Sequence, residues 1–192
     1  MNLPNKLTVL RILLIPVFIV FAALPPSAVN CLLAMAVFSI ASYTDYLDGH
    51  IARKQGLTTD FGKFADPLAD KILTTTALLY MMMDGVCHPV VLVIIVTREF
   101  AVSGVRMVAA GAPGGGKVIA ANFWGKLKTV VQMVCVIAYY FLAGVAYVFS
   151  SNMMLAVVQT TIWWLCWAVA GITAVSGFQY IWGNKEYIIT AK

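Results

Sequence analysis

Six long apolar segments constrain the fold of this 192-residue chain more than any other feature. The chain is 61% hydrophobic and 11% charged, and its mean hydropathy of +0.88 is too high for a soluble globular protein. A helix needs about 20 apolar residues to cross a bilayer, where it satisfies its own backbone hydrogen bonds. The sequence therefore predicts one all-α, polytopic membrane domain over residues 1–192, with six transmembrane helices near residues 9–25, 29–51, 67–84, 88–110, 126–149 and 153–182.

The basic residues predict the orientation of these helices. Segments at one side of a six-helix arrangement carry Lys or Arg, whereas those around Pro25, Asp84 to His88 and Ser150 carry none. By the positive-inside rule, both termini face the cytoplasm. The net charge of +5 is thus explained by topology and gives no reason to expect a nucleic-acid partner. The basic residues on the cytoplasmic side are Lys6, Arg11, Arg53, Lys54, Lys63, Lys117, Lys126, Lys128, Lys185 and Lys192.

Four of the eight acidic residues lie in two closely spaced pairs. Asp45 and Asp48 are three residues apart, and Asp66 and Asp70 are four apart, so each pair projects from one face of a helix. Gathered carboxylates in a poorly hydrated place need a cation, and oxygen-only ligands favour Mg²⁺ or Mn²⁺. Arg53, close to Asp48 in the sequence, indicates a phosphate ligand beside the metal. The segment therefore predicts a metal and diphosphate site.

The spacing D-x2-D-G-x2-A-R-x8-G-x3-D-x3-D resembles the signature of the CDP-alcohol phosphatidyltransferases, which are integral-membrane enzymes with six transmembrane helices. The resemblance implies two bound ions, Mg²⁺ or Mn²⁺, held by Asp45, Asp48, Asp66 and Asp70. It also implies that Asp70 is the general base, and that the chain forms a homodimer. The matching residues are Asp45, Asp48, Gly49, Ala52, Arg53, Gly62, Asp66 and Asp70.

The residues expected to contact the CDP-diacylglycerol donor come from two segments. Arg53 would hold the diphosphate, while small residues beside it allow the ligand to approach the backbone closely. An Asn-x2-Thr-x2-Arg start also resembles the family's N-terminal segment, which lines the nucleotide site there. Interfacial anchoring is the alternative for these N-terminal residues. The candidate donor-binding residues are Asn5, Thr8, Arg11, Gly49, Ala52, Arg53 and Gly62.

Charges in the fourth apolar segment predict a second part of the site. Arg98 and Arg106 are eight residues apart, about two helical turns, and so lie on one stripe. An ion pair between Arg98 and Glu99 is not expected, because adjacent residues on a helix point about 100° apart. Lys126 and Lys128 open the fifth segment at the same side, where membrane anchoring is the favoured alternative for one of the two. Together these four basic residues form a candidate pocket for an anionic acceptor.

Two single residues and one further segment have more ordinary expected roles. Lys71 is either a partner of the carboxylates or a charge on a helix face. His88 has no second histidine in range and is expected at the surface or in a helix cap. The last apolar segment, with Trp163, Trp164 and Trp167, is expected to pack against lipid and to contribute an interfacial aromatic element.

The Thr97-Arg98-Glu99-Phe100 and Trp124-to-Thr129 segments resemble the phosphatidylglycerophosphate synthase branch of the family. That resemblance implies transfer of a phosphatidyl group from CDP-diacylglycerol to glycerol 3-phosphate, giving phosphatidylglycerophosphate and CMP in phospholipid biosynthesis. It places the chain in the bacterial cytoplasmic membrane, surrounded by membrane lipid, with the active site facing the cytoplasm.

Three alternatives stay open at the level of sequence. The same chemistry could use another acceptor, such as inositol phosphate, serine or phosphatidylglycerol. A membrane prenyltransferase also uses aspartates, metal and diphosphate, but its chain is usually longer and the spacing here does not match. A membrane cation transporter could use intramembrane aspartates, yet transport sites usually lie near the bilayer midplane and in internally repeated halves, which this chain lacks.

Overall fold

The computed structural model describes residues 3–55, 60–110 and 123–185, and the side chains of residues 7–44, 68–107 and 123–185. The described residues form six helices and no strands, which confirms the all-α prediction. Each helix coincides with one of the six apolar segments of the sequence. The helices are α1 (Leu3–Ala23), α2 (Ala28–Gln55), α3 (Asp60–Met83), α4 (Pro89–Ala110), α5 (Phe123–Val148) and α6 (Asn152–Gly183).

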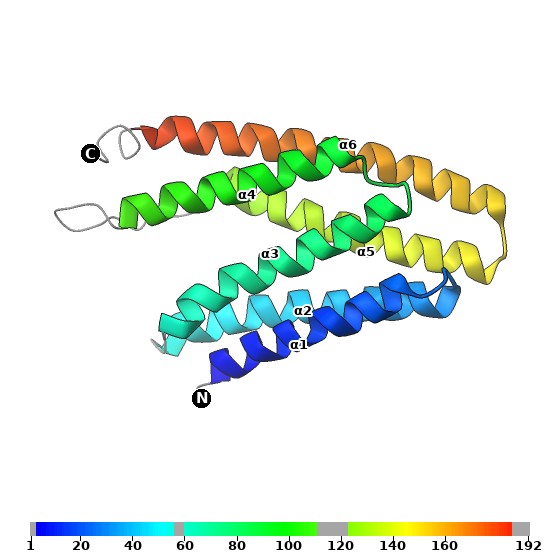
Figure 1. Cartoon of the computed structure of the whole chain (residues 1–192), viewed down its shortest axis with the longest axis horizontal. Helices are drawn as coiled ribbons and strands as arrows, with labels where there is room; N and C mark the ends of the chain where they lie inside the picture. The colour runs from blue at the N-terminus through cyan, green and yellow to red at the C-terminus, as the bar shows by residue number, and fades with distance from the viewer. Residues whose placement is uncertain (1–2, 56–59, 111–122, 186–192) are drawn as a thin grey trace.

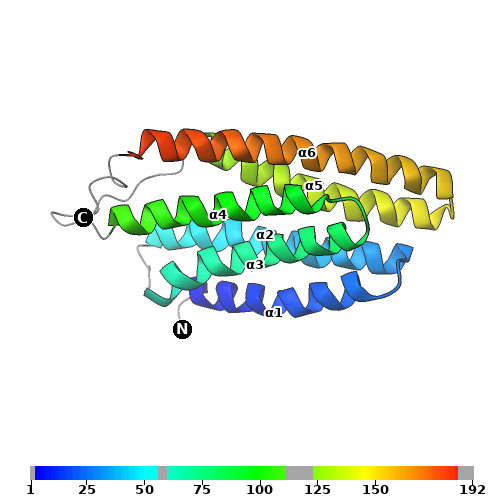
Figure 2. The same ribbon diagram turned by 45° about the horizontal axis from the view of Figure 1, so that its top comes forward.

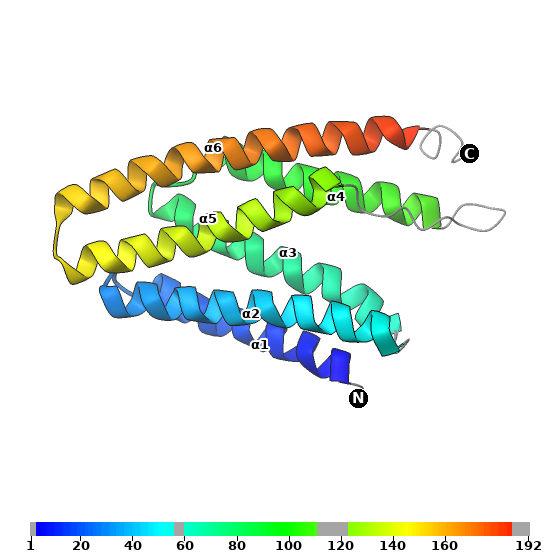
Figure 3. The same cartoon turned by 180° about the vertical axis from the view of Figure 1, so that it is seen from behind.

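The helices run up and down along one long axis (Figure 1). In the turned view, α1, α2 and α3 form one half of the bundle, while α4, α5 and α6 form the other (Figure 2). Helices α2 and α5 join the two halves, and α4 packs against α6. Seen from behind, α5 crosses in front of α3 and α4 (Figure 3). Consecutive helices alternate in direction (Figure 1). One end of the bundle therefore holds the starts of α1, α3 and α5 and the last turns of α2, α4 and α6.

Among the described residues, α5 and α6 are each long and apolar enough to cross a membrane. Shorter apolar stretches occupy Leu7–Ala23 in α1 and Ala28–Thr44 in α2. Large apolar side chains also lie exposed on the outer faces of the helices, such as Leu13, Val93 and Trp164. A lipid-facing surface accounts for this exposure better than water does.

An aromatic cluster centred on Phe18 holds four helices together. Its ring lies 6.0 Å from that of Phe38 in α2, 6.4 Å from that of Tyr80 in α3 and 5.6 Å from that of Tyr140 in α5. The last two pairs are edge-on, the favourable geometry for aromatic rings. Phe18 itself is fully buried. The cluster thus fixes α1 inside the bundle.

Side chains cap the three helices that begin at the other end of the bundle. Ser27 Oγ accepts a hydrogen bond from the backbone N–H of Asn30 (3.2 Å), and Ser151 Oγ accepts one from Met154 (3.2 Å). His88 is exposed, and its Nδ1 accepts a bond from the N–H of Val90 (3.2 Å) at the start of α4. These contacts satisfy N–H groups that a helix start leaves unpaired. The predicted surface and capping role of His88 is therefore confirmed.

Candidate active site

The carboxylate motif spans the end of α2 and the start of α3. The structure describes the backbone of both helices, and the end of α2 lies beside the start of α3 in Figures 1 and 3. The side chains of Asp45, Asp48 and Asp66, like those of Gly49, Ala52, Arg53, Gly62 and Asn5, lie outside the described residues. Asp70 is described and half-buried on α3. Its carboxylate acts electrostatically on the ammonium groups of both Lys71 and Lys128.

Two of the N-terminal candidates face the interior of the bundle. Thr8 and Arg11 are both 0% exposed on α1. A membrane-anchoring arginine keeps its head group in the interface, so complete burial argues against the anchoring alternative for Arg11. Both lie in the first turns of α1, which begins at the same end of the bundle as α3 (Figure 1). Their burial is consistent with a role in a ligand site.

The side chain of Arg98 extends from α4 toward α6 and lies among polar groups. Its side chain is 10% exposed, and Nη2 donates a 2.8 Å hydrogen bond to Ser176 Oγ. Its Nη1 lies 3.4 Å from Glu99 Oε1, so the expectation that these neighbours do not pair is wrong. Both side chains are long, and they bend from their diverging origins to meet beside Lys128. Among the described residues, Arg98 Nε is buried without a hydrogen-bond partner.

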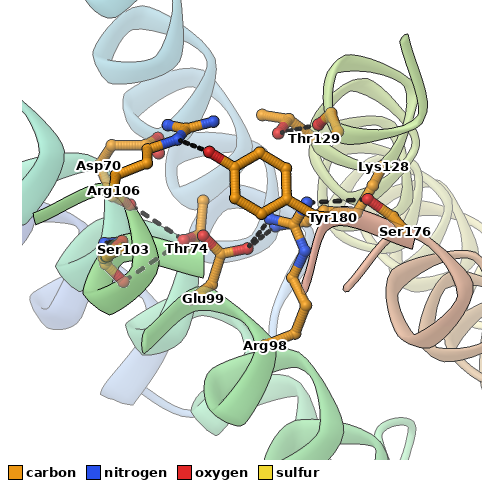
Figure 4. Close-up of polar contacts among 12 residues, drawn as sticks. Asp70, Thr74, Arg98, Glu99, Ser103, Arg106, Lys128, Thr129, Ser176 and Tyr180 are labelled. Atoms are coloured by element: carbon orange, nitrogen blue, oxygen red, sulfur yellow. Dashed lines mark hydrogen bonds and ion pairs between the residues drawn. The ribbon is translucent and has the colours of Figure 1, made fainter. Parts of the chain in front are cut away.

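Glu99 joins the two basic helices of the site. Its Oε1 accepts from Lys128 Nζ, whose side chain on α5 is only 4% exposed, as well as from Arg98. A buried ammonium without a counter-charge is costly, so Glu99 stabilises Lys128 within the bundle. In Figure 4 the carboxylate of Glu99 faces the guanidinium of Arg98. The structure thus brings three charged side chains from α4 and α5 into one group.

Arg106 completes this group near the end of α4. Its Nε donates a 3.1 Å hydrogen bond to the hydroxyl of Tyr180, and its guanidinium lies 5.4 Å from the centre of the same ring. Tyr180 is 3% exposed on α6. In Figure 4 the ring of Tyr180 lies between Arg106 and Arg98. The two arginines therefore do share a stripe, as their spacing predicted, and the stripe faces α6.

The two lysines of α5 have different environments. Lys128 is buried in the polar group, whereas Lys126, two residues earlier, is exposed. Residues two apart point to opposite sides of a helix, which explains the difference. Lys71 is half-buried and donates a hydrogen bond to Ser103 Oγ on α4. We call Arg98, Glu99, Arg106 and Lys128 the basic cluster.

Sequence reasoning missed the contribution of α6. Ser176 and Tyr180 hold the two arginines, yet the whole segment was assigned to lipid packing. A signal was present, because Thr173, Ser176 and Tyr180 recur at spacings of three and four in an apolar helix and are all buried. Such a polar stripe inside a membrane-type helix marks a face turned toward the bundle interior.

A glycine makes room for Arg98. A Cβ built at Gly177 would lie 2.7 Å from Arg98 Cγ, too close for any stable contact, whereas one at Gly171 on the same helix would meet nothing within 4 Å.

We expect Gly177→Ala to lower the free energy of unfolding by about 1–2 kcal/mol through overpacking, despite the better helix propensity of alanine. The matched variant Gly171→Ala is expected to be neutral or stabilising by up to about 1 kcal/mol. Thermal unfolding in detergent compares the two variants with the wild type. Equal melting temperatures for the two variants would contradict the close packing of Gly177 against Arg98.

Comparison with known proteins supports the family that the aspartate motif indicates. The sequence model of the CDP-alcohol phosphatidyltransferase family matches residues 1–172. The chain belongs to this family. It is 38% identical to the CDP-diacylglycerol–glycerol-3-phosphate 3-phosphatidyltransferase of Bacillus subtilis (strain 168), over 99% of this chain and 98% of the relative.

Other relatives carry related names. The protein of the same name from Rickettsia typhi (strain ATCC VR-144 / Wilmington) is 33% identical over 97% of this chain and 98% of its own. A probable phosphatidylglycerophosphate synthase from Mycobacterium tuberculosis (strain CDC 1551 / Oshkosh) is 37% identical, over 84% of this chain and 77% of the relative. As a CDP-alcohol phosphatidyltransferase, the chain is a transferase of a family that uses divalent metal ions.

Proposed function

We propose that the chain transfers a phosphatidyl group from CDP-diacylglycerol to glycerol 3-phosphate, giving phosphatidylglycerophosphate and CMP. Family membership supports the reaction type, and the relatives at 33–38% identity support the acceptor. The observation that carries the proposal is the basic cluster beside Asp70. In it, guanidinium and ammonium groups lie near the Asp70 carboxylate, within a bundle that exposes many large apolar side chains.

The acceptor phosphate fits the basic cluster. Arg106 is exposed although its Nε is bonded, and Arg98 adds a guanidinium that is 10% exposed beside it. The terminal nitrogens of Arg106 can therefore donate further hydrogen bonds to phosphate oxygens, and such charge-assisted bonds are among the strongest in proteins. Lys128 adds a third positive charge from α5. Lys126, being exposed, would act only at the mouth of the pocket.

The donor set of the motif fits divalent cations. Four carboxylates without histidine or cysteine favour Mg²⁺ or Mn²⁺, and the ends of the two helices that carry them lie together. We assign Asp45, Asp48, Asp66 and Asp70 as ligands of two ions. When bound, such ions neutralise the diphosphate of the donor and stabilise the leaving CMP. Arg53 adds a guanidinium for the same diphosphate.

The remaining motif and N-terminal residues are assigned to CDP-diacylglycerol. The buried Thr8 and Arg11 add polar groups in the first turns of α1, which begins at the end of the bundle where α2 ends and α3 begins (Figure 1). Small residues of the motif permit close approach of the ligand to α2 and α3. The donor-binding set is Asn5, Thr8, Arg11, Gly49, Ala52, Arg53 and Gly62.

The chemical step is a displacement at phosphorus. The acceptor hydroxyl attacks the phosphorus attached to diacylglycerol, its proton passes to the Asp70 carboxylate, and the bond from that phosphorus to CMP breaks. A carboxylate is a weak base for an alcohol, so proton transfer accompanies the attack. The basic cluster holds the acceptor phosphate meanwhile, which orients the hydroxyl toward the donor.

We place the chain in the bacterial cytoplasmic membrane as a six-helix, multi-pass homodimer with both termini and the active site facing the cytoplasm. The distribution of Lys and Arg supports this orientation, and the family resemblance supports the dimer. Reporters fused to each terminus check the orientation, since a periplasmic signal from either would refute it. Crosslinking in native membranes checks the dimer.

Release of CMP from CDP-diacylglycerol in detergent tests the proposed reaction. We expect release only with glycerol 3-phosphate and Mg²⁺ or Mn²⁺ present, and negligible release without either. Release with inositol phosphate, serine or phosphatidylglycerol instead would keep the family chemistry and refute the acceptor. No release with any acceptor, together with ion flux in proteoliposomes, would favour a transporter.

A further inference from the structure

A cavity of about 680 Å³ lies between α3 and α4, beside the basic cluster. From α4 it is lined by Glu99, Ser103 and Arg106, whose spacings of four and three residues place them on one face of the helix. From α3 it is lined by Lys71, which donates a hydrogen bond to Ser103 Oγ. The cavity thus combines cationic groups with a carboxylate. This combination suits an anionic ligand that also carries hydroxyl groups.

The two carboxylate oxygens of Glu99 have different surroundings. Oε1 accepts hydrogen bonds from Arg98 Nη1 and from Lys128 Nζ. Among the described residues, no group donates to Oε2. The Glu99 side chain lines the cavity and is 19% exposed, so a ligand in the cavity can reach it. Because an ionised carboxylate has about four acceptor positions, Oε2 is available to a hydroxyl group of that ligand.

Glu99 also lies close to the groups that are assigned to the reaction. Its partner Lys128 is the ammonium on which the Asp70 carboxylate acts electrostatically. Arg106 follows Glu99 by seven residues, about 10 Å along the axis of α4, and lies nearer the end of that helix. A phosphate held by Arg106 therefore places the carbon chain of its ligand in the stretch of cavity between Arg106 and Glu99.

We propose that Glu99 is a specificity-determining residue, which accepts a hydrogen bond at Oε2 from the middle hydroxyl group of glycerol 3-phosphate. In this role, which rests on the function proposed above, the phosphate lies on the basic side chains and the terminal hydroxyl attacks the donor. The middle hydroxyl takes no part in the transfer. A site that binds a hydroxyl group discriminates against an analogue without it, because the acceptor of the site loses its partner. The role also explains why a pocket for an anion contains a carboxylate, whose charge would otherwise only oppose phosphate binding.

The matched analogue is 3-hydroxypropyl phosphate, which keeps the phosphate and the terminal hydroxyl but lacks the middle one. CMP release is measured for the full chain in detergent with saturating CDP-diacylglycerol and Mg²⁺, while each acceptor is varied in turn. We expect the wild-type kcat/KM to be about 10–100-fold higher for glycerol 3-phosphate, the range for one hydrogen bond to a charged group. Glu99→Gln should reduce this ratio to less than about fivefold, because a neutral amide binds the hydroxyl less strongly. The amide oxygen can still accept from Lys128.

A wild-type ratio below about threefold would overturn the proposal, as would a Glu99→Gln variant that keeps the wild-type ratio. Arg106→Ala is the control, because both acceptors carry the phosphate. Its kcat/KM should fall for both acceptors, while their ratio stays within about twofold of the wild-type value. An equal loss of discrimination in Arg106→Ala and Glu99→Gln would mean that a loosened site, and not Glu99, explains the effect.

A second variant keeps the test sharp if Glu99→Gln does not fold. Glu99→Leu combined with Lys128→Met removes the buried ammonium together with its counter-charge, and the same limit of about fivefold applies to its ratio. Failure of the two proposals can be told apart. No CMP release from the wild type with glycerol 3-phosphate would refute the proposed function, whereas release with an unchanged ratio in the Glu99 variants would refute the role of Glu99 alone.

Discussion

Asp70→Asn is expected to lower metal-dependent CMP release by about 10²–10⁴-fold, the usual contribution of a positioned general base. The amide matches the carboxylate in shape but neither takes up a proton nor holds a divalent cation well. The local helix should survive, because the hydroxyl of Thr74 bonds to the backbone carbonyl of Asp70 (2.9 Å) and not to its side chain. The measurement is the steady-state rate of CMP release with saturating CDP-diacylglycerol, glycerol 3-phosphate and Mg²⁺.

Asp84→Asn is the matched control for this variant. It makes the same chemical change at the opposite end of the bundle, where an amide oxygen can still accept the bond from Tyr139. Its rate should stay within about twofold of the wild type. If Asp70→Asn kept more than a tenth of the activity while folded, the assignment of Asp70 as the base would be wrong.

Arg98→Ala is expected to raise the KM for glycerol 3-phosphate by about 10–100-fold. The change removes charge-assisted hydrogen bonds of about 1.5–3 kcal/mol each and leaves Ser176 without its donor. The KM for CDP-diacylglycerol should change by less than about twofold, because the donor is assigned to other residues. Initial rates measured while each substrate is varied in turn separate the two constants.

Lys126→Ala is the control for the basic cluster. It also removes one positive charge near the site, but from an exposed side chain. Its KM for glycerol 3-phosphate should rise by no more than about threefold. Equal effects of the Lys126 and Arg98 variants would mean that general electrostatic attraction, and not a built pocket, binds the acceptor.

The sequence predicted the helices well because the signal is strong. Apolar runs of membrane length leave few structures other than helices, and turn-forming residues mark their limits. The predicted segment 88–110 became Pro89–Ala110, and 153–182 became Asn152–Gly183. That six helices cross a bilayer stays a prediction, since α5 and α6 are the helices that meet the length and composition test among the described residues.

The site was predicted unevenly. Fixed spacings identified the carboxylate motif, and family membership agrees with it. The stripe of Arg98 and Arg106 was also predicted, because a helix repeat places residues eight apart on one face. The pairing of Arg98 with Glu99 was missed because helical angles describe where side chains start and not where long, flexible ones end.

What the sequence determined by itself is local: the helical segments, the spacing of the aspartates and the faces on which charges lie. The tertiary structure alone decided which faces meet. It selected Lys128 over Lys126 for the basic cluster, and it brought Ser176 and Tyr180 of α6 against the arginines of α4. The physical reason is that periodicity fixes the direction of a side chain relative to its own helix, whereas its partner depends on how helices distant in the sequence pack together.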